Sequence, residues 1–389
     1  MCHTHTLSAF FSYFCSMIRI AIIGFGQRGQ ATFARLQHIK NAEVVMLCDT
    51  NRKAMDNLEP EKRKGVICTT DYHEVTQTDD LHLIYICTPW DMHVDIAVEA
   101  MNHGKHVAIE VPAAMTVDEC EMLVRVSKWT ERHCVMLENC CYDTWHLGIR
   151  EMVQQGLLGR VTHLEGAYIH PVESNWMEKH RKSHKGNPYP THGLGPMCQL
   201  LDADDNLQSL VSMSSTDSEK GFHINNTLLQ TRKGVSMLLQ YDTSTPRPYS
   251  RLQTVCGTNG YAQKYPLPTI QIKDTDVCCK RKEAEGAAGG EATMSSDETT
   301  EKLLVGAEAT AYVESYIPPV FQQLIEDGKR LGVANIMNYM MDRRLIDGLE
   351  SGQTHLDMEV HEAALWSSLT ELTERSVILG NKKIEIPDF

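Results

Sequence analysis

Short hydrophobic runs alternate with longer mixed segments through the first third of the chain. The runs hold mostly aliphatic residues and lie at 18–23, 42–48, 83–87, 106–109 and 134–137. Nearly continuous apolar runs of this length are typical of strands buried on both faces of a parallel sheet. Between them lie segments with helical spacing, clearest at 94–102 and 116–130. This alternation predicts an α/β fold with a doubly wound parallel sheet of right-handed βαβ units.

The pattern changes after residue 138. Extended, partly alternating segments follow one another there, at 160–170, 208–216, 224–232, 235–242 and 252–256. Such segments, with short turns between them, predict a second, α+β domain with an open, mainly antiparallel sheet. The segment 315–379 has a helical pattern, and 384–389 is expected to be extended. Residues 281–311 are rich in Glu, Ala, Gly, Ser and Thr, which predicts a mobile surface insertion.

The composition of the chain limits the cellular compartments and the binding partners that we expect. The chain has 389 residues, which favours two domains, and its formal charge of −14 argues against nucleic acid as a partner. Its 13 cysteines show no C-x-x-C or other zinc-type spacing, so we expect a reducing, cytoplasmic compartment and no metal site. Residues 1–16 hold an apolar run too short to span a membrane and lacking the basic start of a signal peptide. We interpret them as a dispensable N-terminal extension or as the result of a start assigned upstream of Met17, and we expect no membrane partner.

A glycine-rich turn follows the first predicted strand. Gly24-x-Gly26-x-x-Gly29 lies between this strand and a helix, and Asp49 ends the second strand twenty residues later. Gly24 allows a tight turn, Gly26 lets the backbone approach a pyrophosphate, and Gly29 lets the helix pack closely on the strand. Asp49 would bind the adenosine ribose diol and repel a 2′-phosphate, which favours NAD. The cations at 52–53 keep NADP open, and Asp49 could also cap a helix.

Polar clusters follow three of the predicted strands, at 88–93, 110–112 and 138–139. Ligands of doubly wound sheets bind beyond the carboxyl ends of the strands, so these clusters are candidates for the binding site. Trp90 and His93 in the first cluster could contact a cofactor, or could pack the loop and cap the next helix.

The stretch from Gly186 to Pro196 reads Gly-Asn-Pro-Tyr-Pro-Thr-His-Gly-Leu-Gly-Pro. Glycine and proline at this density predict a fixed loop and not the interior of a helix or strand. The loop carries a phenol, Tyr189, and an imidazole, His192. Both groups can transfer protons once their environment is suitable, so the loop is a candidate for catalysis.

Together these patterns resemble the glucose–fructose oxidoreductase/inositol dehydrogenase family (Gfo/Idh/MocA). The resemblance divides the chain into a dinucleotide-binding domain at 17–138 and a substrate-binding domain at 139–389. Most members of that family have Glu-Lys-Pro after a strand, and the lysine helps to activate the reacting hydroxyl; here the middle residue is Val111. Sheet-to-sheet dimers are common in the family, so the resemblance allows a homo-oligomer.

One branch of the family fits the change at Val111. Motifs similar to those of glycoside hydrolase family 109 occur at 110–114, 137–140, 165–170, 187–196, 244–251 and 384–389. The resemblance runs from 18 to 389 and implies an NAD-dependent α-N-acetylgalactosaminidase. It also implies a redox route in place of a catalytic carboxylate pair. Hydride leaves C3 of the sugar for NAD, a base removes the C2 proton, the aglycone leaves, water adds, and the hydride returns.

The glycine motif and the resemblance together select the site residues. Cofactor contacts are expected at Gly24, Gly26, Gln27, Arg28, Gly29, Asp49, Trp90, Asp91, Met92, His93, Glu110, Val111, Asn139 and His192. Catalytic groups are expected at His192, Tyr189, His170 and Tyr168, and sugar contacts at Tyr168, Tyr189 and Tyr249. With valine in place of the lysine, His192 or a neighbouring tyrosine is the candidate base at the C3 hydroxyl. Each of these residues taken singly could instead serve packing or a backbone hydrogen bond.

Three departures from the branch bear on substrate specificity. The loop between His170 and Trp176 is short, Met177 replaces an arginine that tends to contact sugar, and 332–335 lacks a Gly-His-Gly-Gly-like stretch. The leading hypothesis is a glycosidase that acts on a terminal α-linked N-acetylgalactosamine or a related glycan terminus. The alternatives are an NAD(P)-dependent sugar oxidoreductase of the wider family, against which Val111 counts, and a non-catalytic sugar- or dinucleotide-binding relative.

Overall fold

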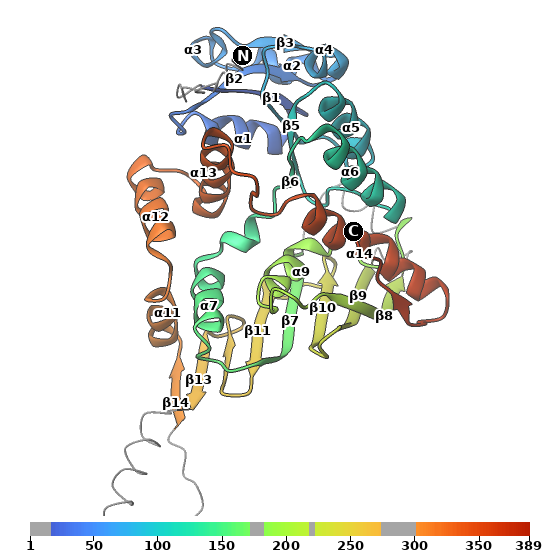
Figure 1. Cartoon of the computed structure of the whole chain (residues 1–389), viewed down its shortest axis with the longest axis vertical. Coiled ribbons are helices and arrows are strands. Elements are labelled where there is room, and N and C mark those ends of the chain that lie inside the picture. The colour runs from blue at the N-terminus through green and yellow to red at the C-terminus, as the bar shows by residue number, and fades with distance from the viewer. Residues whose placement is uncertain (1–16, 172–182, 218–221, 274–300) are drawn as a thin grey trace, which may run out of the picture.

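The computed structural model describes residues 17–171, 183–217, 222–273 and 301–389. The predicted N-terminal extension, the shortened loop with Met177, and most of the predicted insertion lie outside these residues. The described chain forms two units, with a Rossmann unit at the top of Figure 1 and a unit built on a large sheet below it.

The Rossmann unit is built on a six-stranded sheet in the order β3-β2-β1-β4-β5-β6. Its strands are β1 Ile18–Ile23, β2 Ala42–Cys48, β3 Ile67–Thr69, β4 Leu83–Ile86, β5 His106–Ile109 and β6 Cys134–Met136. All neighbouring strands are parallel, which confirms the predicted doubly wound sheet. The strand order reverses between β1 and β4, and ligands of such sheets bind at this point, beyond the carboxyl ends of the strands.

Helices connect these strands. They are α1 Gln27–Leu36, α2 Arg52–Asp56, α3 Pro60–Arg63, α4 Tyr72–Thr76, α5 His93–Asn102 and α6 Val117–Thr130, with short 3₁₀ turns at η1 Trp90–Met92 and η2 Asn139–Tyr142. A capping box starts α6, because the Thr116 side chain accepts from the Glu119 N–H while the Glu119 carboxylate accepts from the Thr116 N–H. This cap fixes the chain shortly after the Glu-Val-Pro segment.

The second unit is built on a nine-stranded sheet in the order β14-β13-β12-β11-β7-β10-β9-β8-β15. Its strands are β7 Val161–Ile169, β8 Leu207–Asp217, β9 Phe222–Thr231, β10 Ser236–Asp242, β11 Ser250–Gly257, β12 Gly260–Gln263, β13 Thr269–Lys273, β14 Glu301–Val305 and β15 Ile384–Glu385. β7 and β10 are parallel, and the other neighbouring pairs are antiparallel. The predicted open, mainly antiparallel sheet is therefore confirmed.

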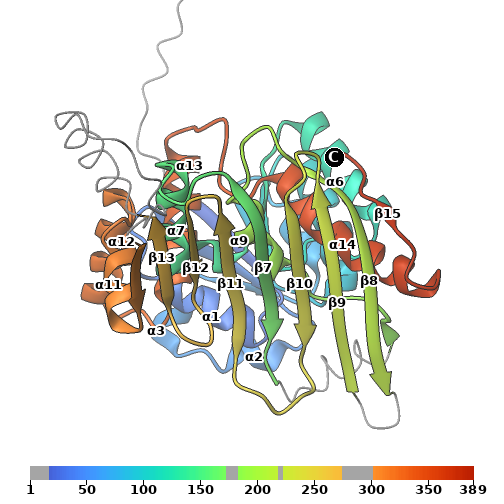
Figure 2. The same cartoon turned by 90° about the horizontal axis from the view of Figure 1, so that it is seen from below.

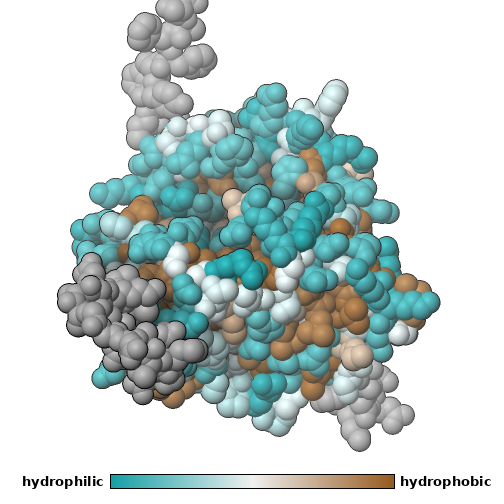
Figure 3. All heavy atoms as spheres, turned by 60° about the horizontal axis from the view of Figure 1, so that its bottom comes forward, coloured by the Kyte–Doolittle hydropathy of each residue, from teal (hydrophilic) through white to brown (hydrophobic). Residues whose placement is uncertain are grey.

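Helices cover one face of this sheet. Figure 2 shows α7 Thr144–Gln154, α9 Thr191–Cys198 and α14 Val360–Ile378 behind the strands. Figure 3 shows the molecule with this lower side brought forward, where hydrophobic side chains form brown patches on the surface. Met213 of β8 and Leu228 of β9 contribute exposed apolar area, at 56% and 61% exposure. Among the described helices, none has the length and apolar composition needed to cross a membrane.

The Gly186–Pro196 stretch is not wholly a loop, contrary to the prediction. Residues from Thr191 form α9, and Pro196 lies inside this helix. The glycines serve close packing: a Cβ on Gly193 would lie 2.7 Å from the backbone nitrogen of Ala167 in β7, and one on Gly195 would lie 2.8 Å from the Trp366 ring. The many glycines here allow helix α9 to pack closely against the sheet. The prediction had interpreted them only as residues that favour turns.

The predicted insertion at 281–311 is shorter on its C-terminal side than expected. Residues 301–305 form β14, which pairs antiparallel with β13, and α11 Ala307–Glu314 begins two residues later. β14 is an edge strand with mostly exposed side chains. The strand holds Glu301, Lys302 and three apolar residues, so the predicted insertion was extended too far toward its C-terminal side.

Two of the C-terminal helices join the units. After α11, the chain forms α12 Pro319–Leu331, α13 Ile336–Glu350 and then α14. On α13, the buried Asp342 accepts a hydrogen bond from Arg35 of α1 at 2.8 Å and one from Tyr85 of β4 at 3.2 Å. Side-chain oxygens of α14 accept from backbone N–H groups of both units, in the pairs Ala113–Ser367, Asn187–Thr373 and Ser212–Ser376. These bonds fix the two units around the edge where the site lies.

Candidate active site

The glycine-rich turn after β1 has room for a phosphate. Gly24 has a φ of +91°, and Cβ atoms on Gly24 and Gly29 would lie 2.5 Å from the Cys87 carbonyl and 2.0 Å from the Gly24 oxygen. Gly26 differs, since a Cβ there would meet no described atom within 4 Å. Gly26 is the N-cap of α1, and no side chain caps the helix. Open space in front of uncapped N–H groups fits a pyrophosphate.

Asp49 follows β2 and faces this turn. Its Oδ2 accepts from the Phe25 N–H at 2.6 Å, and its Oδ1 accepts from the Asn51 N–H at 2.7 Å. Asn51, not Asp49, is the N-cap of α2, so the capping alternative is not what the structure shows. The partly exposed carboxylate keeps further lone pairs for a ribose diol.

Trp90 and His93 hold together the loops that follow β4 and β5. The Trp90 indole donates to the Val111 carbonyl at 3.1 Å. His93 is fully buried, with its ring nitrogens 2.9 Å from the Pro112 carbonyl and 3.0 Å from the Thr88 carbonyl. These contacts favour the packing interpretation for His93, whose ring has no surface left for a ligand.

The other predicted cofactor residues lie around the same edge. Gln27 and Asp91 are exposed, and Met92 is half-buried. Asn139, the first residue of the turn η2, donates from Nδ2 to Asn338 of α13 at 2.6 Å. Cofactor contacts by these residues stay predictions.

Glu110 and Arg28 form an ion pair between β5 and α1. The carboxylate and guanidinium are 3.6 Å apart, and the Glu110 side chain is 13% exposed. Burial is the largest effect on Glu110 and raises the pKa of its carboxyl, although Arg28 acts to lower it. The carboxylate chiefly raises the pKa of Arg28, against burial. Glu110 is therefore engaged with a cation on the side where the cofactor is predicted.

His192 lies between two buried polar side chains, those of Glu138 and Tyr189. Its Nδ1 lies 2.8 and 2.9 Å from the two carboxylate oxygens of Glu138, which is fully buried, and its Nε2 lies 3.3 Å from the Tyr189 hydroxyl. Burial lowers the pKa of His192, but hydrogen bonds to Cys140 and Glu138 and the negative charge that these two groups carry when deprotonated outweigh burial and raise the pKa to about 10. Burial raises the pKa of Glu138, but His192 and other hydrogen-bond donors reverse this and hold it below its usual value. The resting pair is an imidazolium and a carboxylate.

Aromatic rings surround this pair. Tyr168 and Tyr189 have ring centroids 4.8 Å apart, and the Tyr168 ring meets His192 edge to face at 5.4 Å. The Tyr168 hydroxyl lies 3.4 Å from Nδ1 of His170, whose ring meets Tyr249 at 5.3 Å. Burial raises the pKa of Tyr168 to about 12 and that of Tyr189 well above its usual value, so both phenols are protonated at rest.

The structure therefore brings all five predicted catalytic and sugar-contacting residues into one cluster. The cluster is closed at Tyr189, which is 8% exposed and stacks on Trp90 at 5.7 Å, and it is open at Tyr249, which is 42% exposed. Stacking on Trp90 links the cluster to the predicted cofactor edge. The cluster therefore opens to solvent on the side of Tyr249 and His170.

Two residues of the cluster were missed as functional groups. Glu138 was noted only as a strand end, and Cys140 only as part of a motif. A carboxylate placed directly after a buried strand was the available signal for Glu138. Cys140 offered none, because its contact with His192 depends on how α9 packs.

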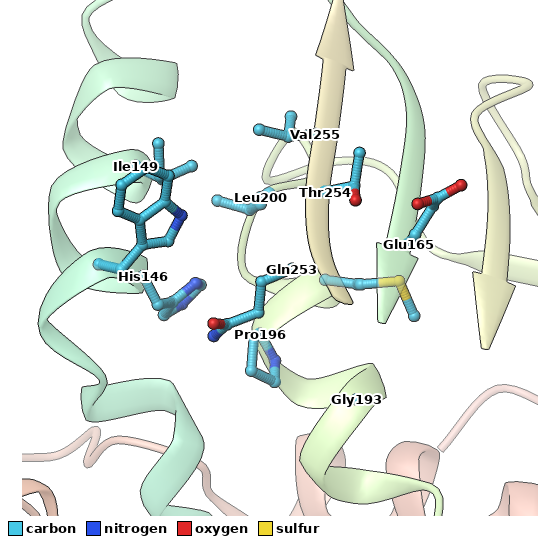
Figure 4. Close-up of a pocket in the computed structure, with 11 residues that line it drawn as sticks. His146, Ile149, Glu165, Gly193, Pro196, Leu200, Gln253, Thr254 and Val255 are labelled. Atoms are coloured by element: carbon cyan, nitrogen blue, oxygen red, sulfur yellow. The ribbon is translucent and has the colours of Figure 1, made fainter. Parts of the chain in front are cut away.

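A small cavity, shown in Figure 4, lies apart from this cluster. It is enclosed by α7, α9 and the β7–β11 pair, among residues that include His146, Glu165 and Gln253, and its volume is about 20 Å³. Both amide atoms of Gln253 are buried without a partner in the described chain. The cavity can hold about one water molecule and no sugar.

Comparison with known proteins identifies the fold of the chain. A family model described as "Oxidoreductase family, NAD-binding Rossmann fold" matches residues 18–138. The scyllo-inositol dehydrogenase of Lactobacillus casei, solved with NAD(H) and scyllo-inositol, is similar with a TM-score of 0.69 and 14% identity over 95% of this chain and 99% of that one. An oxidoreductase from Agrobacterium radiobacter has a TM-score of 0.71 and 13% identity over 95% and 98%. The chain thus has the Gfo/Idh/MocA fold with an NAD-binding Rossmann domain.

The sequence relatives narrow this class. A second model, "Glycosyl hydrolase 109, C-terminal domain", matches residues 217–389. Glycosyl hydrolase family 109 protein 2 of Phocaeicola vulgatus is 40% identical over 96% of this chain and 94% of its own length. A Bacteroides fragilis protein named alpha-N-acetylgalactosaminidase is 40% identical over 96% and 92%. The chain belongs to glycoside hydrolase family 109, which confirms the resemblance and makes it a glycoside hydrolase.

Proposed function

We propose that this enzyme hydrolyses terminal α-linked N-acetylgalactosamine, or a closely related glycoside, with NAD as its cofactor. The name of the Bacteroides fragilis relative, at 40% identity, supports the sugar. The open Gly26 cradle and the Asp49 carboxylate support the dinucleotide. In this proposal the turn from Gly24 to Gly29 holds the pyrophosphate and Asp49 holds the adenosine ribose.

When bound, the nicotinamide supplies reversible hydride transfer at the C3 carbon of the sugar. The chain's own residues then handle protons and charge. Loss of hydride from C3 requires that the proton of the C3 hydroxyl pass to a base. His192, once it has released its Nε2 proton, would take that proton, and the imidazolium so formed, held by Glu138, would donate a hydrogen bond to the C3 oxygen. Such stabilisation makes the neighbouring C2 proton more acidic. The Tyr168–His170 pair, on the open side of the cluster, is placed to exchange that proton.

The observation that carries the proposal is the buried Glu138–His192–Tyr189 chain beside Tyr168, at the edge where this fold binds dinucleotides. Ordinary glycosidases use two carboxyl groups, one as an acid and one as a base or nucleophile. Here Glu138 is fully buried against His192, and Glu110 is paired with Arg28. Neither is free for that role in the resting enzyme, which favours the redox route.

The test uses an aryl α-N-acetylgalactosaminide in D₂O with the purified full chain. We expect released sugar that carries deuterium at C2, with no net accumulation of reduced cofactor. The His192→Ala variant should lose roughly 10²–10⁴-fold in rate. The matched control is His163→Ala, a histidine on strand β7 that is bonded to Ser236 away from the cluster, and it should retain activity.

The same assay distinguishes the alternatives. Reduced cofactor formed in proportion to sugar, without release of the aryl group, would identify a net oxidoreductase and refute the hydrolase proposal. Absorbance of the supernatant after denaturation reports whether the purified protein carries a dinucleotide. Full activity in protein shown to be free of dinucleotide would refute the cofactor part alone.

A further inference from the structure

Three metal-binding side chains meet at the centre of the cluster. Donor atoms of Glu138, Cys140 and His192 all lie within 4.8 Å of one another. Glu138 is fully buried and Cys140 is 3% exposed, while the His192 side chain retains 12% exposure. A small ion can therefore reach the group from the His192 side.

Two of the donors are fixed by one short turn. The Cys140 N–H donates to Oε1 of Glu138 at 3.0 Å, and Glu138 caps the 3₁₀ turn η2 that contains Cys140. The third donor comes from α9, 54 residues further along the chain, and its Nδ1 already points at the carboxylate. The turn and the packed helix preorganise the three donors before any ion binds.

Thiolate, imidazole and carboxylate are ligands that Zn²⁺ takes in proteins. Tetrahedral bonds of 2.0–2.3 Å place neighbouring donor atoms about 3.5 Å apart. The Glu138–His192 contact of 2.8 Å would open by less than 1 Å once the shared proton leaves, and the sulfur would close toward them. One coordination position would stay open on the exposed side.

The charges of the donors also suit a dication. A thiolate and a carboxylate neutralise a charge of +2 when the imidazole is neutral. Arg251 interacts electrostatically with Cys140 and is itself paired with the buried Asp143. This pairing limits repulsion of an incoming ion.

We propose that Glu138, Cys140 and His192 form a binding site for a thiophilic divalent cation, best matched by Zn²⁺, and that an occupied site inhibits the enzyme. Binding displaces the proton on His192 and the proton of the Cys140 thiol. The ion then occupies Nδ1 and separates His192 from the Glu138 carboxylate that holds it, which disturbs the proton chemistry at Nε2. The inhibitory part rests on the proposed function, whereas the binding part does not. The sequence predicted no metal site because the donors have no zinc-type spacing and meet only in the fold.

The test is a Co²⁺ titration of the purified full chain, followed by absorbance. We expect a saturable thiolate-to-cobalt band and tetrahedral cobalt bands at one equivalent, both displaced by Zn²⁺. Cys140→Ser should remove the thiolate band and weaken binding by at least about 100-fold, since loss of a direct ligand exceeds the effect of outer-shell changes. The matched control is Cys141→Ser, the adjacent buried cysteine outside the donor group, which should keep the signal.

Thermal melts of both variants verify that they fold, and His192→Ala provides a second variant for the binding readout. A band of equal size in wild type and Cys140→Ser, or no saturable signal in the wild type, would overturn the site. Zn²⁺ should also lower wild-type glycoside turnover reversibly, with recovery on adding EDTA. Binding without glycosidase activity would refute the proposed function and leave the site intact, and activity that is unaffected by bound Zn²⁺ would refute only inhibition.

Discussion

Replacing Glu138 with Gln tests the central charge pair, because it keeps the shape of the side chain and removes its charge. In the native protein, burial lowers the pKa of His192 while Cys140 and Glu138 raise it, from 6.5 to about 10. A shift of this size corresponds to roughly 5 kcal/mol in favour of the cation. Because two groups share this effect against burial, we expect Glu138→Gln to lower the pKa of His192 by at least about 2 units.

The same shift links stability to pH. Since the pKa of His192 is higher in the folded than in the unfolded protein, its stabilising contribution is complete below the unfolded value of 6.5 and is lost as the pH rises through about 10. Within this window the wild type should lose roughly 1.4 kcal/mol of unfolding free energy per pH unit from this group. Glu138→Gln should remove most of that slope.

The assay is NMR of protein labelled with ¹³C at histidine Cε1. The titration runs from about pH 6 to about pH 11, which covers both the ordinary pKa of histidine and the raised pKa of His192. The His192→Ala spectrum identifies the resonance. The matched control is Glu99→Gln, which removes a carboxylate bonded to the exposed His73 at 2.8 Å and should leave His192 unchanged. If His192 still titrated near its native value in Glu138→Gln, our account of the pair would be refuted.

Four further variants test the frame around the site. Gly26→Ala should fold with a stability within about 1 kcal/mol of wild type, since its Cβ meets no described atom within 4 Å. It should bind NAD at least about 10-fold more weakly by calorimetry, because the methyl group fills the space expected to hold the phosphates. Equal affinity in the variant and the wild type would contradict this role of Gly26. Gly29→Ala should cost about 2–3 kcal/mol in urea unfolding, because its Cβ would lie 2.0 Å from a backbone oxygen; wild-type stability would contradict the geometry. Asp342→Ala should cost about 3–5 kcal/mol in the same measurement, since it leaves the buried Arg35 unpaired, and a loss below 1 kcal/mol would show that the pair contributes little. Tyr189→Phe keeps the ring stacked on Trp90 but removes the hydroxyl, so kcat should fall about 10²-fold at an unchanged Tm; an unchanged kcat would exclude a role for the hydroxyl.

Much of the fold follows from local patterns in the sequence. The buried strands β1, β2 and β4 are short aliphatic runs, and the glycine turn after β1 was recognised from its spacing together with its place between a strand and a helix. These features depend on neighbours in the chain, which periodicity and glycine placement record. Tyr189 was found from the loop rich in glycine and proline and Tyr168 by motif similarity, and their meeting needed the fold.

What could not be predicted depends on partners distant in sequence. Gly193 and Gly195 predicted a loop because nothing in the chain shows that β7 and Trp366 press against them. Asn139 has an amide partner on α13 that no spacing reveals. The Cys140–His192 contact arises likewise from packing between η2 and α9, so even the identity of the functional groups was incomplete without the structure.

The position of helix α14 near the C-terminus affects how the protein can fold during translation. Its side chains accept backbone hydrogen bonds from Ala113, Asn187 and Ser212, which belong to segments synthesised long before it. A ribosome has therefore passed residue 360 before these groups find their partners. The Rossmann sheet can form during translation, but the two units are locked around the site only near the end of synthesis. A message cut short before α14 would yield a chain with every predicted site residue and no assembled site.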